Sequence, residues 1–252
     1  PTNNWYEATF NMEIPDTEKD GYTYNYTPKK RTSLFGRINY DYKEKYMASF
    51  TLRADGSSNF AKGHQWGYFP SVSAGWVVSS EPFMESTKNW MDFLKVRGSW
   101  GQNGNCNISG YQYLTTFAFD VTNGYYFGKD KSSQTTGGYA NILKNPDVTW
   151  ETSEQLDLGF DARFFDTRLG VAFDWYKKTT KDWLVVAPIL STYGLNAPYI
   201  NGGDVENQGF ELALNWNDKI GKDLKYGVNL NISKNKNKVT RIANSEGIIH
   251  GE

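Results

Sequence analysis

The chain has 252 residues and a formal net charge of −1, with 27 basic and 28 acidic side chains. This balance carries no bulk electrostatic signal for nucleic acid, and no apolar run approaches the ~20 residues that a membrane-spanning helix requires. Aromatic residues make up 16% of the chain, a content that suits β structure and surfaces that meet a membrane interface or a sugar. Composition therefore excludes a helical membrane protein and leaves a β-barrel open.

Apolar and polar residues alternate with a period of two in eight segments of the chain. These segments span residues 33–42, 46–55, 68–79, 92–101, 150–163, 168–178, 208–217 and 225–234. Most have about ten residues, which matches a tilted membrane-crossing strand of ~9–11 residues better than the ~5–6 residues of an average soluble strand. The pattern predicts an all-β, antiparallel fold.

Each of the eight segments has one face without charge. In the first segment this face carries Leu34, Ile38 and Tyr40, and in the last it carries Leu230 and Ile232. The opposite face holds charged residues among Ser, Asn and Gly, which is typical of a barrel with a lipid-facing side and a wet lumen. We expect the following residues to face the lumen: Arg37, Arg53, Lys95, Arg97, Asp157, Asp161, Arg163 and Asp174.

The connections between the segments alternate in length. Those at 43–45, 164–167 and 217–224 are short and 80–91 is of medium length with one expected helical turn, whereas 56–67, 102–149 and 179–207 are longer. Short periplasmic turns and long extracellular loops are typical of outer-membrane barrels. Aromatic residues also fall at the ends of the apolar stretches, where amphipathic rings prefer the lipid headgroups. The expected lipid-interface residues are Tyr42, Tyr46, Trp76 and Trp216 on the periplasmic side, and Trp100 and Trp175 on the outer side.

Eight strands can close a small barrel whose interior is filled by side chains. Here the expected inward face is polar and the loops are long, so a segment of a larger, wide-lumen barrel fits the sequence better. A soluble β-sandwich would instead bury Trp76, Trp100, Trp175 and Trp216 in a common core.

Several stretches of the chain resemble the barrel region of the SusC/RagA family of TonB-dependent outer-membrane transporters. They include "LRADGSSNF" (52–60), "GYFPSVSAGW" (67–76), "LKVRGSWGQNGN" (94–105) and "NGGDVENQGFEL" (201–212), and they occur in the family's order.

This resemblance implies a plug domain inside a barrel of about 22 strands, located as a multi-pass protein in the outer membrane of Gram-negative bacteria. It also implies a SusD-like surface lipoprotein as partner, the TonB complex as the source of energy, and an oligosaccharide or peptide substrate. We expect residues 1–252 to form part of a single barrel domain, towards its C-terminal half, with the plug domain and the closing C-terminal strands outside it.

Catalytic patterns in the sequence are weak. "RADGSSNF" places Ser57 and Ser58 near acids without a suitable histidine, so we expect a Gly-Ser turn that leads a strand into an exposed loop. Asp157 and Asp161 lie roughly 13 Å apart along one strand, more than the ~5–9.5 Å of glycosidase carboxylate pairs. We expect these aspartates to pair with Arg163 or with an arginine on a neighbouring strand.

Ligand-binding patterns are equally sparse, apart from one long loop. Two histidines and one cysteine offer no metal-ligand spacing, so we expect no metal, no cofactor and no enzymatic activity; calcium binding by Asp/Asn-rich loops remains a lesser alternative. Loop 102–149 combines tyrosines with asparagines, which suits glycan contact, and the alternative is packing within the loop or against the partner lipoprotein. The candidate substrate-binding residues are Trp66, Tyr111, Tyr113, Tyr125 and Tyr126.

The sequence therefore predicts an uptake channel that lies in the lipid bilayer of the outer membrane and imports, most simply, oligosaccharides. Its expected partners are its own plug domain, the TonB complex and a SusD-like lipoprotein, and no nucleic acid is expected to bind. Two alternatives from other classes are a soluble β-sandwich carbohydrate-binding module and a secreted β-rich glycoside hydrolase.

Overall fold

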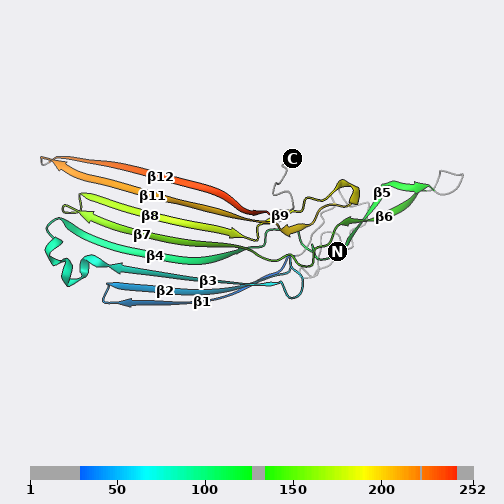
Figure 1. Ribbon diagram of the computed structural model, residues 1–252, viewed down its shortest axis with the longest axis horizontal. Coiled ribbons are helices and arrows are strands. Elements are labelled where there is room, and N and C mark those ends of the chain that lie inside the picture. Colours follow the sequence, from blue (N-terminus) through cyan, green and yellow to red (C-terminus); the bar gives the residue numbers. More distant parts are fainter. Residues whose placement is uncertain (1–28, 127–133, 222, 243–252) are drawn as a thin grey trace, which may run out of the picture.

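Eight long strands form one antiparallel sheet in the computed structural model, which describes residues 29–126, 134–221 and 223–242 (Figure 1). Its strands lie in the order β1-β2-β3-β4-β7-β8-β11-β12. Their bounds are β1 Arg31–Tyr42, β2 Tyr46–Ser57, β3 Trp66–Val77, β4 Met91–Asn105, β7 Glu151–Phe164, β8 Leu169–Lys181, β11 Gly203–Ile220 and β12 Leu224–Ile242. All eight predicted strands are present, and each pairs with the next long strand along the chain.

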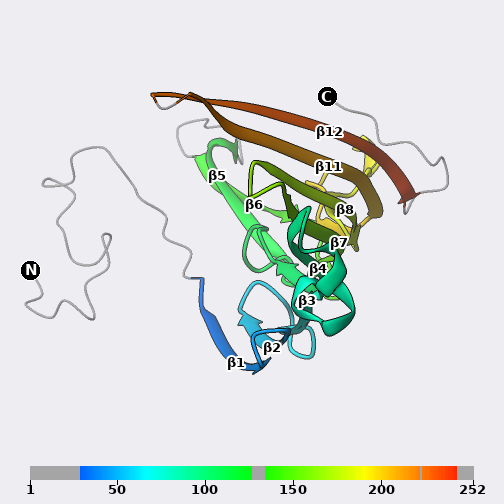
Figure 2. The same ribbon diagram turned by 90° about the vertical axis from the view of Figure 1, so that its left-hand side faces the viewer.

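The sheet is a single curved layer whose strands follow an open arc when viewed along its length (Figure 2). This arrangement confirms the predicted class, an antiparallel barrel segment, and contradicts the β-sandwich alternative. Trp76 is 38% exposed, and Trp100, Trp175 and Trp216 are only half-buried. The four tryptophans therefore share no common core.

The register joins the apolar residues of all strands into one stripe. Residues directly opposite each other in an antiparallel pair point to the same face. Phe50 is paired with Val72, Val72 with Trp100, and Trp100 with Leu156. Further along the sheet, Phe160 is paired with Phe173, which is paired with Leu212 in turn. We call this side the apolar face and the other side the polar face.

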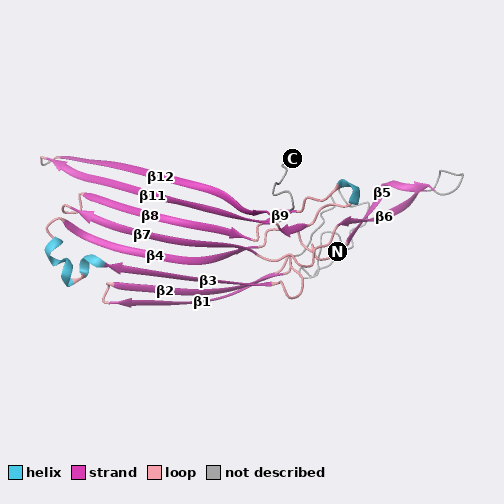
Figure 3. Ribbon diagram, viewed as in Figure 1, coloured by secondary structure: helices cyan, strands magenta, loops and turns pink. Residues whose placement is uncertain are grey.

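The two ends of the sheet differ. At the short-turn end, Lys43 and Glu44 both have φ of 55°, and Lys45 N–H donates to the Tyr42 carbonyl, as in a type I′ hairpin turn. The connection between β3 and β4 contains two 3₁₀ helices, η2 (Val78–Ser80) and η3 (Pro82–Thr87), which confirms the expected helical turn (Figure 3). No helix in the described ranges is long and apolar enough to cross a membrane.

At the long-loop end, the connections contain further strands that the alternation did not reveal. β5 (Thr116–Tyr126) pairs with β6 (Gln134–Ile142), β9 (Leu184–Val186) pairs with β10 (Tyr199–Asn201), and η4 (Ser191–Tyr193) lies between the latter two. β4, β8, β11 and β12 also continue further into this end than predicted. Their backbone pairing persists beyond the point where the apolar alternation stops.

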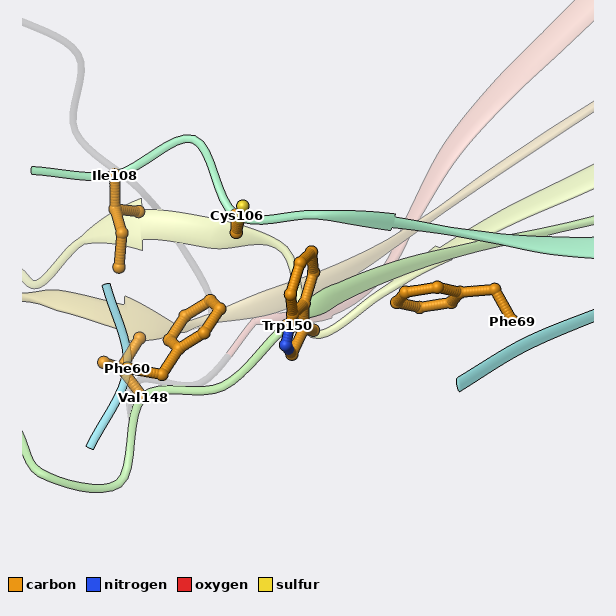
Figure 4. Close-up of a cluster of buried hydrophobic side chains, with 6 residues drawn as sticks. All are labelled: Phe60, Phe69, Cys106, Ile108, Val148 and Trp150. Carbon is orange, nitrogen blue, oxygen red and sulfur yellow. The ribbon is translucent and has the colours of Figure 1, made fainter. Parts of the chain in front are cut away.

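A small core lies at the long-loop end. Phe60 and Val148 are fully buried, and Phe69 and Trp150 are 5% and 8% exposed. The Trp150 ring lies 5.3 Å from that of Phe60 and 5.5 Å from that of Phe69, measured between centroids. Together with Cys106 and Ile108 these residues form what we call the loop core (Figure 4). The loop core holds the long loops against β2, β3 and β7 at the long-loop end of the sheet.

Candidate functional site

The polar face carries all eight residues that were predicted to face a lumen. Arg97 is opposite Gly75 on β3 and Gly159 on β7, and Lys95 is opposite Asp161. The remaining members follow in the same register: Arg37, Arg53, Asp157, Arg163 and Asp174. Grooves run along this face, and the one between β2 and β7 is lined by Ser49, Ser73, Gly75, Lys95, Arg97, Ser99, Asp157 and Gly159 among others.

Arg97 is the centre of an ion-pair cluster that joins three strands. Its Nη1 and Nη2 donate to the two carboxylate oxygens of Asp174 at 2.6 and 2.7 Å, and its Nε donates to Asp161 Oδ2 at 3.0 Å. Arg97 lies on β4, Asp161 on β7 and Asp174 on β8. Bidentate Arg–carboxylate pairs are the stronger class of hydrogen bond, so this cluster links neighbouring strands across the polar face.

A glycine makes this cluster possible. In the register Gly159 lies between Arg97 and Asp174. A Cβ atom at Gly159 would collide with Asp174 Oδ1 and with the carbonyl oxygen of Phe173. The missing side chain therefore allows the ion pair to cross β7 at close range.

The other polar-face charges have different partners. Asp157 accepts hydrogen bonds from Gln155 Nε2 at 3.0 Å and from Ser99 Oγ at 3.4 Å. The Arg163 guanidinium lies 5.5 Å from the Phe93 ring centroid. The predicted pairing of an aspartate with an arginine on a neighbouring strand is confirmed for Asp161, whereas pairing with Arg163 is wrong because Arg163 stacks on an aromatic ring instead.

Glu81, between η2 and η3, organises the aromatic residues at the short-turn end. Tyr46 Oη donates to Glu81 Oε1 at 2.6 Å, Trp76 Nε1 donates to the same oxygen at 3.2 Å, and Lys45 Nζ contacts Oε2 at 3.4 Å. The rings of Tyr42, Tyr46 and Trp76 stack in sequence, with centroids 6.4 and 6.3 Å apart. Of the residues predicted for the interface at this end, Tyr46 and Trp76 thus share one hydrogen-bonded group, and Tyr42 stacks on it.

Two of the remaining predicted interface residues, Trp216 and Trp100, also have hydrogen-bonded polar tips. Trp216 Nε1 donates to Tyr226 Oη at 3.4 Å at the short-turn end, and Trp100 Nε1 donates to Glu154 Oε1 at 3.0 Å near the long-loop end. Trp175 lies opposite Leu158 and Phe210 on the apolar face. An apolar ring body with a satisfied polar tip is the form that aromatic girdles take.

We expect Glu81→Gln to remove an acid-sensitive contribution to stability. The hydrogen bonds from Tyr46, Trp76 and Lys45 lower the pKa of Glu81 below its ordinary value of 4.5. A carboxylate with a lowered folded-state pKa stabilises the fold above the ordinary pKa, and this contribution is lost as pH falls through the folded value. Thermal unfolding followed from pH 7 to pH 3 should therefore show a steeper loss below about pH 4.5 for the wild type than for the variant. Parallel profiles would contradict this role; Glu85→Gln, at a more exposed site of η3, is the control.

The loop core shows a function for the "RADGSSNF" stretch that sequence reasoning missed. Asn59 is 1% exposed, and its Nδ2 donates to the carbonyls of Cys106 at 2.9 Å and Ile108 at 3.3 Å. Asp55 and Gly56 belong to β2 and not to a turn. The prediction of an exposed loop here is wrong, because the stretch enters the loop core. The "SNF" pattern itself, an amide beside a large apolar residue, is the signal that could have indicated an anchor.

Two further asparagines hold the long loops. Asn145 Nδ2 donates to the Tyr199 carbonyl at 2.7 Å. Asn201 accepts from Thr149 N–H at 2.9 Å and donates to the carbonyls of Thr149 and Asp182. Side-chain amides can satisfy both donors and acceptors of irregular backbone, and here they join β10 to Asn145 and Thr149.

The candidate substrate residues do not form one cluster. Tyr111 and Tyr113 lie together, with ring centroids 6.2 Å apart, and flank the buried Gln112, whose Oε1 accepts from Tyr199 N–H. Trp66 lies on the apolar face, where its ring covers Gly56, away from the polar face. Tyr125 and Tyr126 end β5, and their side chains lie outside the described ones. In the part of the chain that the structure describes, no three His, Cys, Asp or Glu side chains group as a metal site.

A curved antiparallel sheet with one apolar face, aromatic residues at both ends of that face, and a charged opposite face defines a transmembrane β-barrel segment. Residues 2–248 match the TonB dependent receptor-like, beta-barrel family. The chain belongs to this family of outer-membrane receptors and transporters.

Similar proteins agree with this assignment. The TonB-dependent receptor P3 of Formosa agariphila is 36% identical over 86% of the chain, and the TonB-dependent receptor SusC of Bacteroides thetaiotaomicron is 30% identical over 94%. A solved structure of the RagAB peptide importer in the closed-closed state covers 85% of the chain with 27% identity and a TM-score of 0.75. The chain spans 21%, 24% and 23% of the length of these three proteins, respectively.

Proposed function

We propose that the chain forms part of the wall of a TonB-dependent importer, within a single barrel domain. Its apolar face contacts lipid, its polar face lines the lumen, and its long-loop end lies outside the cell. The observation that carries this proposal is the register, because it collects the apolar residues on one side and all eight predicted charged residues on the other. The charged side chains of the Arg97 cluster satisfy one another. We therefore infer that the polar face guides or docks other molecules and performs no catalysis.

We further propose that the importer takes up oligosaccharides, together with a SusD-like lipoprotein, its own plug domain and the TonB complex. The similarity to SusC and the tyrosines and asparagines of the long loops support this substrate class. Peptide import is the second candidate, and the similarity to RagAB, a peptide importer by name, favours it.

Uptake by intact cells distinguishes the two substrates. Cells with and without the gene for the intact protein are given fluorescently labelled oligosaccharides or labelled peptides, with and without a functional TonB complex. The proposal expects TonB-dependent accumulation of the oligosaccharide alone. Accumulation of only the peptide favours the second candidate, and accumulation of neither above the gene-deleted level contradicts import of both classes.

The double substitution Tyr111→Ala with Tyr113→Ala should weaken oligosaccharide binding about tenfold, because each lost aromatic contact contributes about 0.5–1.5 kcal/mol. Calorimetric titration of the purified intact protein measures this effect. Tyr68→Ala is the matched control, since Tyr68 is 64% exposed but lies on the apolar face opposite Ala54. Equal affinities in the double variant and the wild type would remove these tyrosines from the substrate site.

A further inference from the structure

Three lysines continue the apolar face of β12 beyond the point where its apolar residues end. Along this face of β12, Val228, Leu230 and Ile232 are followed by Lys234, Lys236 and Lys238. The register confirms that they share a side, since Leu212 is opposite Ile232 and Phe210 is opposite Lys234. All three lysines are exposed, and successive ones lie about 7 Å apart along the strand. We call them the lysine row.

Nearby cations on the same face differ from the row because they have carboxylate partners. Lys177 Nζ contacts Glu206 Oε2 at 2.8 Å, and Lys181 Nζ contacts Glu154 Oε2 at 2.7 Å. Arg241 contacts both Asp204 and Asp182 at 2.8 Å. Glu206 is opposite Lys238 in the register, but its ion pair is with Lys177. Within the described ranges, the three lysines of the row make no ion pair, so positive charge is in excess here.

The position of the row selects its partner. A row of lysines where a lipid-facing apolar stripe ends, on the side of the long loops, is at the level of the lipid headgroups. Long lysine side chains extend towards that layer. The long-loop end is the extracellular end in the proposed orientation. The headgroup layer on that side of an outer membrane carries lipopolysaccharide, whose lipid A anchor bears phosphate.

We propose that Lys234, Lys236 and Lys238 form a binding strip for the phosphate groups of lipid A in the outer leaflet. The acyl chains of the lipid would lie against Leu230, Ile232 and Phe210 on the same face. The strip holds the long-loop end at a fixed height relative to the membrane surface. This inference rests on the proposed orientation of the apolar face towards lipid.

The test compares two charge-matched triple variants of the intact protein, purified in detergent. In the first, Lys234, Lys236 and Lys238 are each replaced by Gln. In the control, Lys178, Lys219 and Lys225 are each replaced by Gln; these are exposed lysines of β8, β11 and β12 on the polar face. The probes are monophosphorylated lipid A, the same lipid after enzymatic dephosphorylation, and inorganic phosphate.

The first variant should bind monophosphorylated lipid A on the order of 100-fold more weakly than the wild type, since each of the three lysines near an anionic lipid surface contributes about fivefold. The control should bind as the wild type does, and dephosphorylated lipid A should not distinguish the proteins. Equal binding of monophosphorylated lipid A by all three proteins overturns the proposal and means that the row only contacts water. Inorganic phosphate bound as tightly as lipid A also overturns it, in favour of a free-phosphate site.

Two outcomes separate this proposal from the one on which it rests. Loss of lipid A binding in the control, with normal binding in the first variant, means that the polar face contacts lipid, and the proposed orientation then fails as well. If the first variant does not fold, the wild type decides the question alone: equal affinity for phosphorylated and dephosphorylated lipid A overturns the binding strip while leaving the orientation intact.

Discussion

Replacing Phe173 with arginine is expected to destabilise the folded barrel by about 2–4 kcal/mol, because a charge on the lipid-facing side of a barrel strand is costly near the middle of the bilayer. Phe173 lies in the centre of the apolar face. Its ring stacks with those of Phe160 at 5.7 Å and Phe210 at 6.3 Å, measured between centroids. The measurement is denaturant unfolding of the intact protein in lipid vesicles, followed by tryptophan fluorescence.

Two control substitutions separate the charge effect from lost packing. Phe173→Leu removes the stacked ring but keeps an apolar side chain, and should cost about 1 kcal/mol. Ala172→Arg introduces the same charge one residue away, on the polar face, opposite Asp161 and Ala213, and should cost much less than Phe173→Arg. If the two arginine variants are equally destabilised, the apolar face does not face lipid.

The second large effect is expected for Phe60→Ala, which should destabilise the loop core by about 3–5 kcal/mol, the usual cost of deleting a buried phenylalanine side chain. Phe60 is fully buried, and its ring packs on Trp150 at 5.3 Å between centroids. The cost should remain local, because the long strands are joined by their own backbone pairing. Hydrogen exchange should therefore accelerate in segments 106–108 and 145–150, while β7 and β8 keep their protection.

Phe119→Ala is the matched control, since Phe119 lies on β5 and is 73% exposed. This substitution should leave exchange in the loop core unchanged. Unchanged protection in both variants would contradict the role of the loop core as the anchor of the long loops. Faster exchange throughout the sheet of the Phe60 variant would instead show that the loop core supports the whole segment.

The long strands and their faces were predictable because their information is local. Successive side chains of a strand point to opposite faces, so a residue such as Ile38 or Leu212 is assigned to a side by its neighbours alone. The parts of β4, β8, β11 and β12 that extend into the long-loop end were not predictable in this way. There, both faces become polar while backbone pairing continues, as at Lys234 and Asn235 on β12, and the period-two signal disappears.

The sequence by itself determined the fold class, the approximate positions of the long strands along the chain, and the division into an apolar and a polar face. Only the tertiary structure decided which groups meet. Arg97 binds Asp161 and Asp174, which are 64 and 77 residues away along the chain, and Asn59 reaches Cys106 across 47 residues. Such partners depend on the register of several strands and on the space left by residues such as Gly159. A period of two assigns a side chain to a face but does not determine its height relative to the next strand.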